Sequence, residues 1–240
     1  MTEDKIEQNS LEILTELGWT VLNGPNIGPD GTNERQYSDT VLKSRLQTAL
    51  ERINSEVSGG TAEAAIAKIL RSTSPDQLTD NRQFHELLVN GVDVESRTHG
   101  SNELKTIKLK LFDFDNIDNN DFVAVNQLTI IQDGVNRRPD VVLFVNGLPL
   151  VVIEIKNAAD SKADVAKAFH QIQTYKHQIS NLFRFNELCV ISDGLDARVG
   201  TLTAPFERFM SWKTIDGERE AGNVPMFDVM IRGLFNKNHL

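Results

Sequence analysis

The stretch RRPDVVLFVNGLPLVVIEIKN, from Arg137 to Asn157, constrains the fold more than any other part of the sequence. Two strongly apolar runs flank an Asn-Gly pair, a combination typical of a β-hairpin. Charged residues stand at the ends of both runs, far from the turn, where a buried and unpaired charge would be costly. The hairpin therefore predicts a site at its open end.

The register of this hairpin decides which charges share a face. Asp140 begins the first run, while Glu154 and Lys156 end the second and point the same way, since strand side chains alternate between faces. Asp140 joins them only if even-numbered residues pair with even-numbered ones, and a two-residue turn at Asn146-Gly147 gives the opposite pairing. We therefore predict a loop of three or five residues, or a β-bulge that restores the pairing.

Two acids and a lysine on one face suit the hydrolysis of a phosphodiester bond. Asp140 and Glu154 offer the hard oxygen ligands that Mg²⁺ prefers, and Lys156 can stabilise the charge of the transition state or position the attacking water. The tripeptide acid-any-Lys is uninformative alone, because it occurs four times in the chain. The apolar strand, the preceding Pro-Asp and the following helix distinguish this copy from a solvated pair of edge charges.

Periodicity assigns the rest of the chain to helices, then strands, then a strand-helix-strand unit. Helices are expected at residues 6–17, 39–54, 58–72, 81–91, 161–180 and 224–235, and strands at 19–22, 91–100, 103–112, 122–134 and 187–194. Ser161 and Asp164 form a capping-box-like start for the fifth helix. This order predicts an α/β fold with a mixed sheet flanked by helices on both faces. We divide it into a helical part at about 1–91, a sheet and catalytic core at about 92–215, and a C-terminal segment at 216–240.

Composition excludes several classes of protein. The 240 residues carry a formal net charge of −9, which argues against unaided electrostatic binding to nucleic acid. Cys189 is the only cysteine, so one chain cannot form a disulfide framework or a cysteine-based zinc site. The acidic N-terminus is unlike a signal peptide, and no apolar run approaches the length of a membrane span. A cytoplasmic protein without a membrane partner is expected.

The same stretch carries a resemblance to a known family. The letters PD, a spacer and EIK resemble the PD-(D/E)XK nuclease superfamily, and the wider wording resembles the restriction (R) subunit of Type I restriction-modification enzymes. Further similar stretches are EQNSLEILTELGW, HELLVNGVDVE, DFDNIDNNDFVAVNQ, SDGLDARVG, APFERFMSWKT and IRGLFNK, so nearly all of the chain is covered. The resemblance implies a restriction-endonuclease-like fold that cleaves double-stranded DNA with Mg²⁺.

More site residues follow from this resemblance. Gln171 and Tyr175 lie four apart on the expected helix and resemble a Q-xxx-Y motif whose side chains flank the active site. Glu7 matches the acid that such nucleases contribute from their first helix. Arg137 and Arg138 adjoin the first acid of the hairpin and are expected to grip the DNA backbone. Lys167 is a further candidate for a phosphate contact, with a solvated helix face as the alternative.

The resemblance also implies partners. Target recognition would belong to a specificity subunit, methylation to a modification subunit that uses S-adenosylmethionine, and cutting would follow ATP-driven translocation by a motor. The chain lacks the GxxxxGK[ST] loop that such motors need, so we interpret it as an excised or truncated nuclease domain, with ATP and S-adenosylmethionine serving only the full complex. Two alternatives are a non-cutting assembly or DNA-guiding module, which the intact acid-lysine set disfavours, and a stand-alone nuclease, which the lack of basic segments disfavours.

Overall fold

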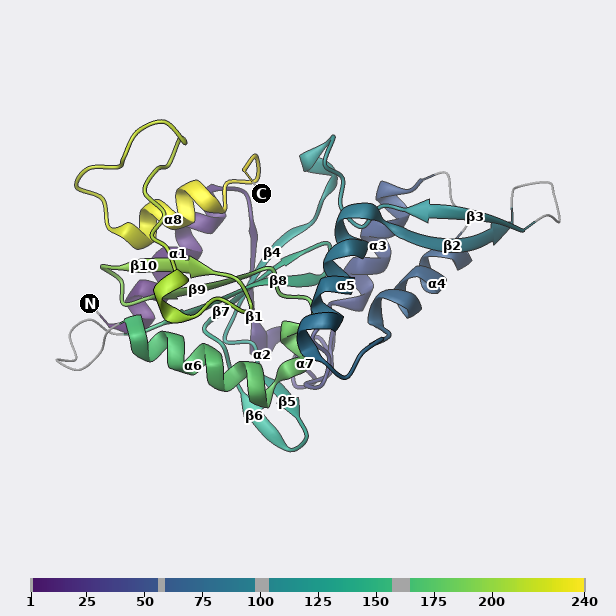
Figure 1. Cartoon of the computed structure of the whole chain (residues 1–240), viewed down its shortest axis with the longest axis horizontal. Helices are drawn as coiled ribbons and strands as arrows, with labels where there is room; N and C mark the ends of the chain where they lie inside the picture. The colour runs from purple at the N-terminus through teal and green to yellow at the C-terminus, as the bar shows by residue number, and fades with distance from the viewer. Residues whose placement is uncertain (1, 56–58, 98–103, 157–164, 240) are drawn as a thin grey trace.

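A mixed six-stranded sheet forms the centre of the computed structural model, which describes residues 2–55, 59–97, 104–156 and 165–239 (Figure 1). Its strands, in spatial order, are β1 (Thr20–Asn23), β4 (Phe122–Asn126), β7 (Val141–Val145), β8 (Leu148–Ile155), β9 (Leu188–Ser192) and β10 (Ala197–Gly200). β1 is parallel to β4 and β8 to β9, whereas the other neighbours are antiparallel. The predicted mixed sheet is confirmed.

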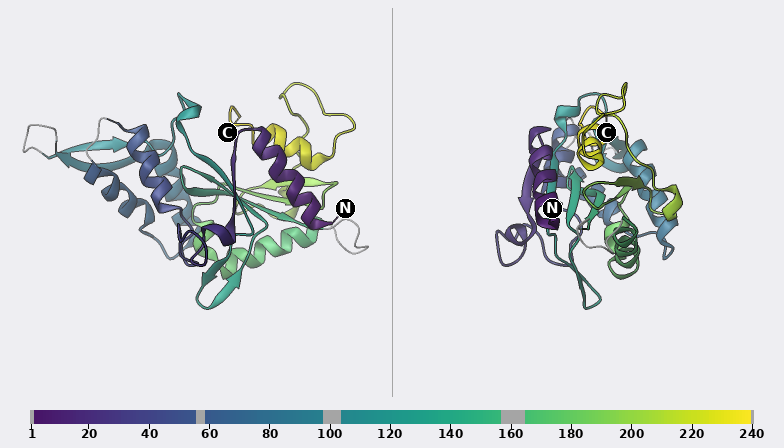
Figure 2. Two further views of the ribbon diagram at one scale, coloured as in Figure 1. Left: turned by 180° about the vertical axis from the view of Figure 1, so that it is seen from behind. Right: turned by 90° about the vertical axis from the view of Figure 1, so that its left-hand side faces the viewer.

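Helices cover both faces of this sheet, as predicted. Figure 2 shows α1 (Glu3–Glu16) and α6 (Val165–Gln178) on opposite sides, with α8 (Met226–Leu234) beside α1. The odd-numbered Val151 and Ile153 of β8 belong to the core cluster that contains the apolar residues of α1 and α8. The even-numbered Val152 belongs to the second cluster, with Ile172 of α6. Even-numbered positions near the end of β8 therefore face α6.

A helical part lies to the right of the sheet in Figure 1. It contains α3 (Lys43–Ile53), α4 (Gly59–Leu70) and α5 (Gln77–Asn90), together with a separate antiparallel ladder of β2 (Val92–Arg97) and β3 (Leu104–Leu109). The short elements are α2 (Gly24–Ile27), η1 (Ile117–Asn119), α7 (Ser180–Phe183) and η2 (Phe206–Arg208). None of the helices within the described ranges has the length and apolar character needed to cross a bilayer.

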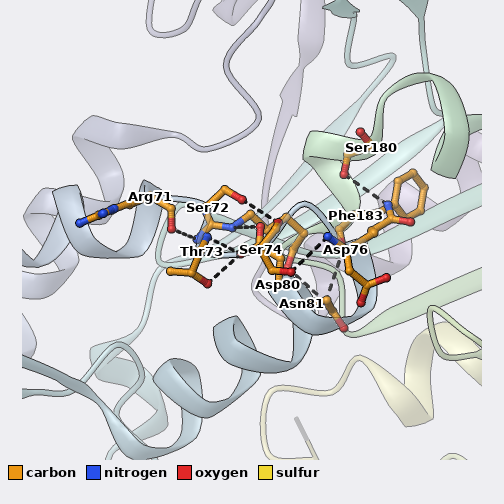
Figure 3. A network of polar contacts seen from close by, with 11 residues as sticks. Arg71, Ser72, Thr73, Ser74, Asp76, Asp80, Asn81, Ser180 and Phe183 are labelled. Atoms are coloured by element: carbon orange, nitrogen blue, oxygen red, sulfur yellow. Dashed lines mark hydrogen bonds and ion pairs between the residues drawn. The ribbon is translucent and has the colours of Figure 1, made fainter.

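A partly buried polar network holds α5 against α7 (Figure 3). Asp80 forms an ion pair with Arg184 at 2.8 Å and accepts a hydrogen bond from the backbone N–H of Thr73. The side-chain amide of Asn81, the next residue along α5, donates to the carbonyl oxygens of Arg184 and Asn186. These contacts join α5 of the helical part to the segment that links α7 to β9.

A bulge in the β7–β8 hairpin changes the pairing so that Asp140 and Glu154 lie on one face. Val145 pairs with Leu148 across a two-residue turn, but the register shifts so that Leu143 pairs with Val151. Leu150 is thereby left without a strand partner, and its carbonyl accepts instead from the backbone N–H of Glu187 at 2.8 Å. Beyond the bulge, even-numbered residues pair with even-numbered ones. The bulge that the sequence predicted as one of its options is confirmed.

The expected strand at residues 122–134 is interrupted. β4 ends at Asn126, and Gln127 adopts a left-handed backbone conformation with φ of 53°. The chain then forms a small projecting hairpin of β5 (Ile130–Gln132) and β6 (Val135–Arg137), which lies at the bottom of Figure 1. The turn at Asp133-Gly134 has positive φ at both residues, the signature of a tight hairpin turn.

Replacing Gly147 with alanine is expected to destabilise the protein by about 2–4 kcal/mol, because both overpacking and a positive φ are penalised. Gly147 has φ of 79°, and a Cβ there would meet the Leu42 carbonyl oxygen at 2.4 Å. Gly134→Ala is the matched control, since Gly134 has the same φ of 79° in open space. Urea unfolding should give a much smaller loss for the control. Equal losses would contradict the steric argument.

Candidate active site at the open end of the hairpin

The structure brings Asp140, Glu154 and Lys156 together. Asp140 directly precedes β7, and one of its carboxylate oxygens accepts the backbone N–H of Ile155 at 2.7 Å across the hairpin. The Lys156 ammonium forms an ion pair with Glu154 Oε1 at 2.6 Å. The backbone N–H of Lys156 also donates to the carbonyl oxygen of Ser192, which ties the site to β9. Two acids and one amine thus share the α6 side of the sheet.

Burial sets the protonation of the two acids. It raises the pKa of Glu154 to about 8, with a further increase from the charge of Asp140 and an opposing effect of Lys156. Burial likewise raises the pKa of Asp140 to about 6, although the Ile155 N–H and Lys156 both favour its charged form. Without a cation, one acid of the pair therefore holds a proton near neutral pH.

Lys156 and Glu154 differ in how well their side chains are compensated by their neighbours. Burial alone would lower the pKa of Lys156, but the charges of Glu154 and Asp140 outweigh it and raise the pKa, so the amine stays an ammonium. Glu154 is 2% exposed, and its Oε2 is buried with no well-formed hydrogen bond among the residues that the structure describes, although the nearby Tyr175 hydroxyl favours the charged carboxylate and lowers its pKa. A buried carboxylate oxygen of this kind is a suitable ligand for a cation.

The donor set fits Mg²⁺ better than a transition metal. Within the described ranges, no group of three or more His, Cys, Asp or Glu side chains could hold a metal ion. Two carboxylates leave most coordination positions to water or substrate, which is the arrangement that Mg²⁺ tolerates and Zn²⁺ does not favour.

Helix α6 contributes the two residues that its spacing predicted to share a face. Tyr175 is buried, and its hydroxyl donates to the carbonyl oxygen of Arg138 at 3.3 Å, just before the first acid. Burial, followed by the nearby charge of Glu154, raises the pKa of Tyr175 well above its usual range, so the phenol is neutral. The half-buried Gln171 lies one turn earlier and interacts with the Tyr175 side chain. The expected cap at Ser161 and Asp164 lies outside the described residues.

Glu7 lies on α1, which covers the opposite face of the sheet, close enough to Asp140 for the two charges to interact. It is half-buried, and its charge contributes to the raised pKa of Asp140, although less than burial does. The amides of Asn126 and Gln127 donate to its two carboxylate oxygens. Sequence reasoning missed this amide pair, because its proximity to Asp140 and to α1 arises only from the order of strands in the sheet.

The side chains predicted to contact DNA differ in their burial and in their contacts within the protein. The Arg137 side chain is half-buried and its Nε donates to the Gln178 side chain at the end of α6. Arg138 is exposed, and Lys167 is exposed on the first turns of α6. Arg137 therefore ties the β5–β6 hairpin to α6, whereas Arg138 lies on the protein surface. Their contacts with DNA stay a prediction.

A mixed sheet between two helical layers, with two acids and a lysine at the end of a central hairpin, defines a restriction-endonuclease-like α/β domain. The family model described as Type I restriction enzyme R protein N terminus matches residues 1–208, and the chain belongs to this family.

Relatives agree with this assignment. The chain is 37% identical over 239 residues to the Type I restriction enzyme HindI endonuclease subunit of Haemophilus influenzae, covering 98% of the chain and 22% of the relative. It is 29% identical over 261 residues to the putative type I restriction enzyme MjaIXP endonuclease subunit of Methanocaldococcus jannaschii, covering 100% of the chain and 25% of the relative. The chain thus spans about a quarter of the length of these relatives.

Proposed function

We propose that this domain cleaves double-stranded DNA by Mg²⁺-dependent hydrolysis of a phosphodiester bond, as the nuclease part of a Type I restriction enzyme. The observation that carries the proposal is the convergence of Asp140, Glu154 and Lys156 at the open end of one hairpin. The names of the relatives, which are endonuclease subunits, support it.

Asp140 and Glu154 would hold the cation. When bound, Mg²⁺ supplies charge neutralisation on the phosphate and lowers the pKa of a coordinated water. It also compensates the repulsion between two carboxylates whose pKa values are raised to about 6 and about 8 in its absence. In the absence of the cation, the Lys156 ammonium, 2.6 Å from Glu154 Oε1, provides part of that compensation.

The neighbouring side chains have distinct tasks in hydrolysis. Because Lys156 is an ammonium, its role is to stabilise negative charge on the phosphate in the transition state rather than to remove a proton from water. Gln171 is a neutral amide and can orient a phosphate oxygen or the attacking water without adding charge. Tyr175 is a neutral phenol whose hydroxyl holds the segment before Asp140 through the Arg138 carbonyl oxygen. As water attacks phosphorus and gives up a proton to solvent, the bond to the leaving sugar oxygen breaks in line, and that oxygen takes up a proton from solvent.

The full enzyme would divide the work among its parts. Since the chain spans 22% and 25% of these two relatives, an ATP-driven motor in the rest of the subunit, together with modification and specificity subunits, is part of the proposal. A nuclease that depends on partners to meet DNA is consistent with a net charge of −9.

Mn²⁺ binding tests the proposed site directly. We expect the metal-free protein to bind Mn²⁺ in a calorimetric titration, and Asp140→Asn to weaken this binding by at least about tenfold. Asp115→Asn, at an exposed carboxylate paired with Lys110, is the matched control and should leave binding unchanged. A crystal soaked in Mn²⁺ should show the ion between Asp140 and Glu154. Binding that is absent, or indifferent to Asp140→Asn, would overturn the proposal.

A further inference from the structure

Two amide side chains at the end of β4 hold the Glu7 carboxylate. Asn126 Nδ2 donates to Glu7 Oε1 at 2.8 Å, and Gln127 Nε2 donates to Glu7 Oε2. Both amides are half-buried, and the Asn126 Oδ1 accepts from the Asn23 amide at 3.3 Å, which turns the Asn126 nitrogen toward Glu7. Each carboxylate oxygen therefore has a fixed donor and keeps lone pairs for another partner.

The backbone places this amide pair next to the first acid of the hairpin. Asn126 is the register partner of Val141, and the backbone N–H of Gln127 donates to the Asp140 carbonyl oxygen at 2.8 Å. Gln127 thus contacts Asp140 through its backbone and Glu7 through its side chain. Its left-handed φ of 53° is uncommon for a residue other than glycine. Such a conformation persists only where the surroundings enforce it.

The packing of Gly24 supplies that constraint. A Cβ at Gly24 would lie 2.5 Å from the Gln127 carbonyl oxygen, so the two backbones approach more closely than any other residue would allow. The end of β4 is consequently held in one conformation, with the Gln127 side chain directed toward α1. Backbone strain of this kind costs free energy, and strained residues cluster at functional sites.

We propose that Asn126 and Gln127 are positioning residues that orient the Glu7 carboxylate toward the cation site formed by Asp140 and Glu154. The inference deepens the proposed function and rests on it. Without the amides, Glu7 would turn into solvent, since its charge and that of Asp140 repel each other. With the amides, Glu7 remains beside Asp140 and adds a third acid to the potential that attracts a divalent cation.

The test is a double-mutant cycle on Mn²⁺ affinity, measured by calorimetry and by the electron paramagnetic resonance signal of free Mn²⁺. Removing both amides, as Asn126→Ala with Gln127→Ala, should weaken binding about tenfold, the low end of the range for residues that support metal ligands. The same removal in a Glu7→Gln background should cost nothing further, because the amides act through Glu7.

Two further variants separate this role from a general structural one. Gln127→Asn keeps an amide and tolerates the left-handed backbone, but its shorter side chain should still lose part of the Mn²⁺ affinity. Gln8→Ala removes a neighbouring exposed amide that bonds Glu12 rather than Glu7, and should change nothing. Thermal unfolding of each variant shows whether it is folded under the conditions of the titration.

The outcomes distinguish the two proposals. If the wild-type protein does not bind Mn²⁺, the proposed function fails and takes this inference with it. If the wild-type protein binds but removing the amides leaves the affinity unchanged, the inference alone is overturned. An equal loss with and without the Glu7 carboxylate would also overturn it, because the amides would then act independently of Glu7.

Discussion

Replacing Lys156 with alanine in the assembled restriction enzyme is expected to reduce DNA cleavage by at least about a hundredfold, the usual effect of removing one group that stabilises transition-state charge. ATP hydrolysis should continue at nearly the wild-type rate, because the proposed motor lies outside this chain. Asp140→Ala should have the same pair of effects, through loss of the cation. The measurement compares linearised plasmid with released phosphate in one reaction.

The matched control is another lysine that is paired with a carboxylate. Lys43 forms an ion pair with Asp39 at 2.8 Å, but its side chain is 53% exposed on α3. Lys43→Ala should therefore leave both cleavage and ATP hydrolysis unchanged. Normal cleavage by the Lys156 and Asp140 variants would refute the catalytic assignment and favour a module that guides DNA or assembles the complex. Brisk cleavage by the isolated chain would instead favour a stand-alone nuclease.

Replacing Glu154 with glutamine is expected to stabilise the metal-free protein at alkaline pH. Burial raises the pKa of Glu154 from 4.5 to about 8, so the folded protein holds this proton more tightly than the unfolded chain does. The resulting stability is complete below a pH of about 4.5 and is lost as the pH rises through about 8. Glutamine cannot ionise, so the variant retains at pH 9 the free energy of unfolding that the wild-type protein loses.

The size of this effect follows from the pKa difference. One pKa unit corresponds to about 1.4 kcal/mol, which gives on the order of 3 to 5 kcal/mol for Glu154. For a protein of this length, that raises the Tm at pH 9 by roughly 6–20 °C. At pH 5 the wild-type acid is protonated, and the two proteins should unfold at nearly the same temperature.

Calorimetry across this pH range checks the prediction. Glu86→Gln, at an exposed position on α5, should give no gain at either pH. Mg²⁺ should raise the Tm of the wild-type protein at pH 8 and leave the Glu154→Gln variant unaffected, since ligand binding stabilises only a protein that has the site. A variant that is less stable than the wild-type protein at pH 9 would show that Glu154 is ionised and well compensated without a metal.

The sequence predicted the central part of the fold because few solutions satisfy a buried hairpin. Apolar runs on either side of Asn146-Gly147 specify two paired strands. Placing Asp140 and Glu154 on one face then requires either a loop of three or five residues or a bulge, and the bulge is what occurs, at Leu150. The elements that escaped prediction are short. α2 and α7 have four residues each, too few for a helical period to be visible.

The interruption after β4 escaped for a different reason. Leu128 and Ile130 continue the apolar pattern of the strand, and both are buried, so periodicity alone predicts one long strand. The break comes from the left-handed backbone of Gln127, which depends on the close approach of Gly24 from another part of the chain. A local sequence pattern contains no signal for such a tertiary contact.

The site residues also divide into those that a local sequence pattern predicts and those that depend on tertiary contacts. The acids and the lysine of the hairpin could be predicted from alternation, and Gln171 and Tyr175 from helical spacing together with the resemblance. The hydrogen bond from Arg137 to Gln178 could not be predicted, because it depends on how the β5–β6 hairpin packs against the end of α6. The amides that hold Glu7 come from a strand whose neighbours in space are remote in sequence.

The unpaired Leu150 restricts how this hairpin can change in evolution. An insertion or deletion of a single residue between the turn and Glu154 would turn both the acid and the lysine toward α1, away from Tyr175. Length variation in this hairpin should therefore proceed by two residues at a time, or by gain and loss of a second irregularity on the same strand. Homologues of different hairpin length would reveal which of these routes has been used.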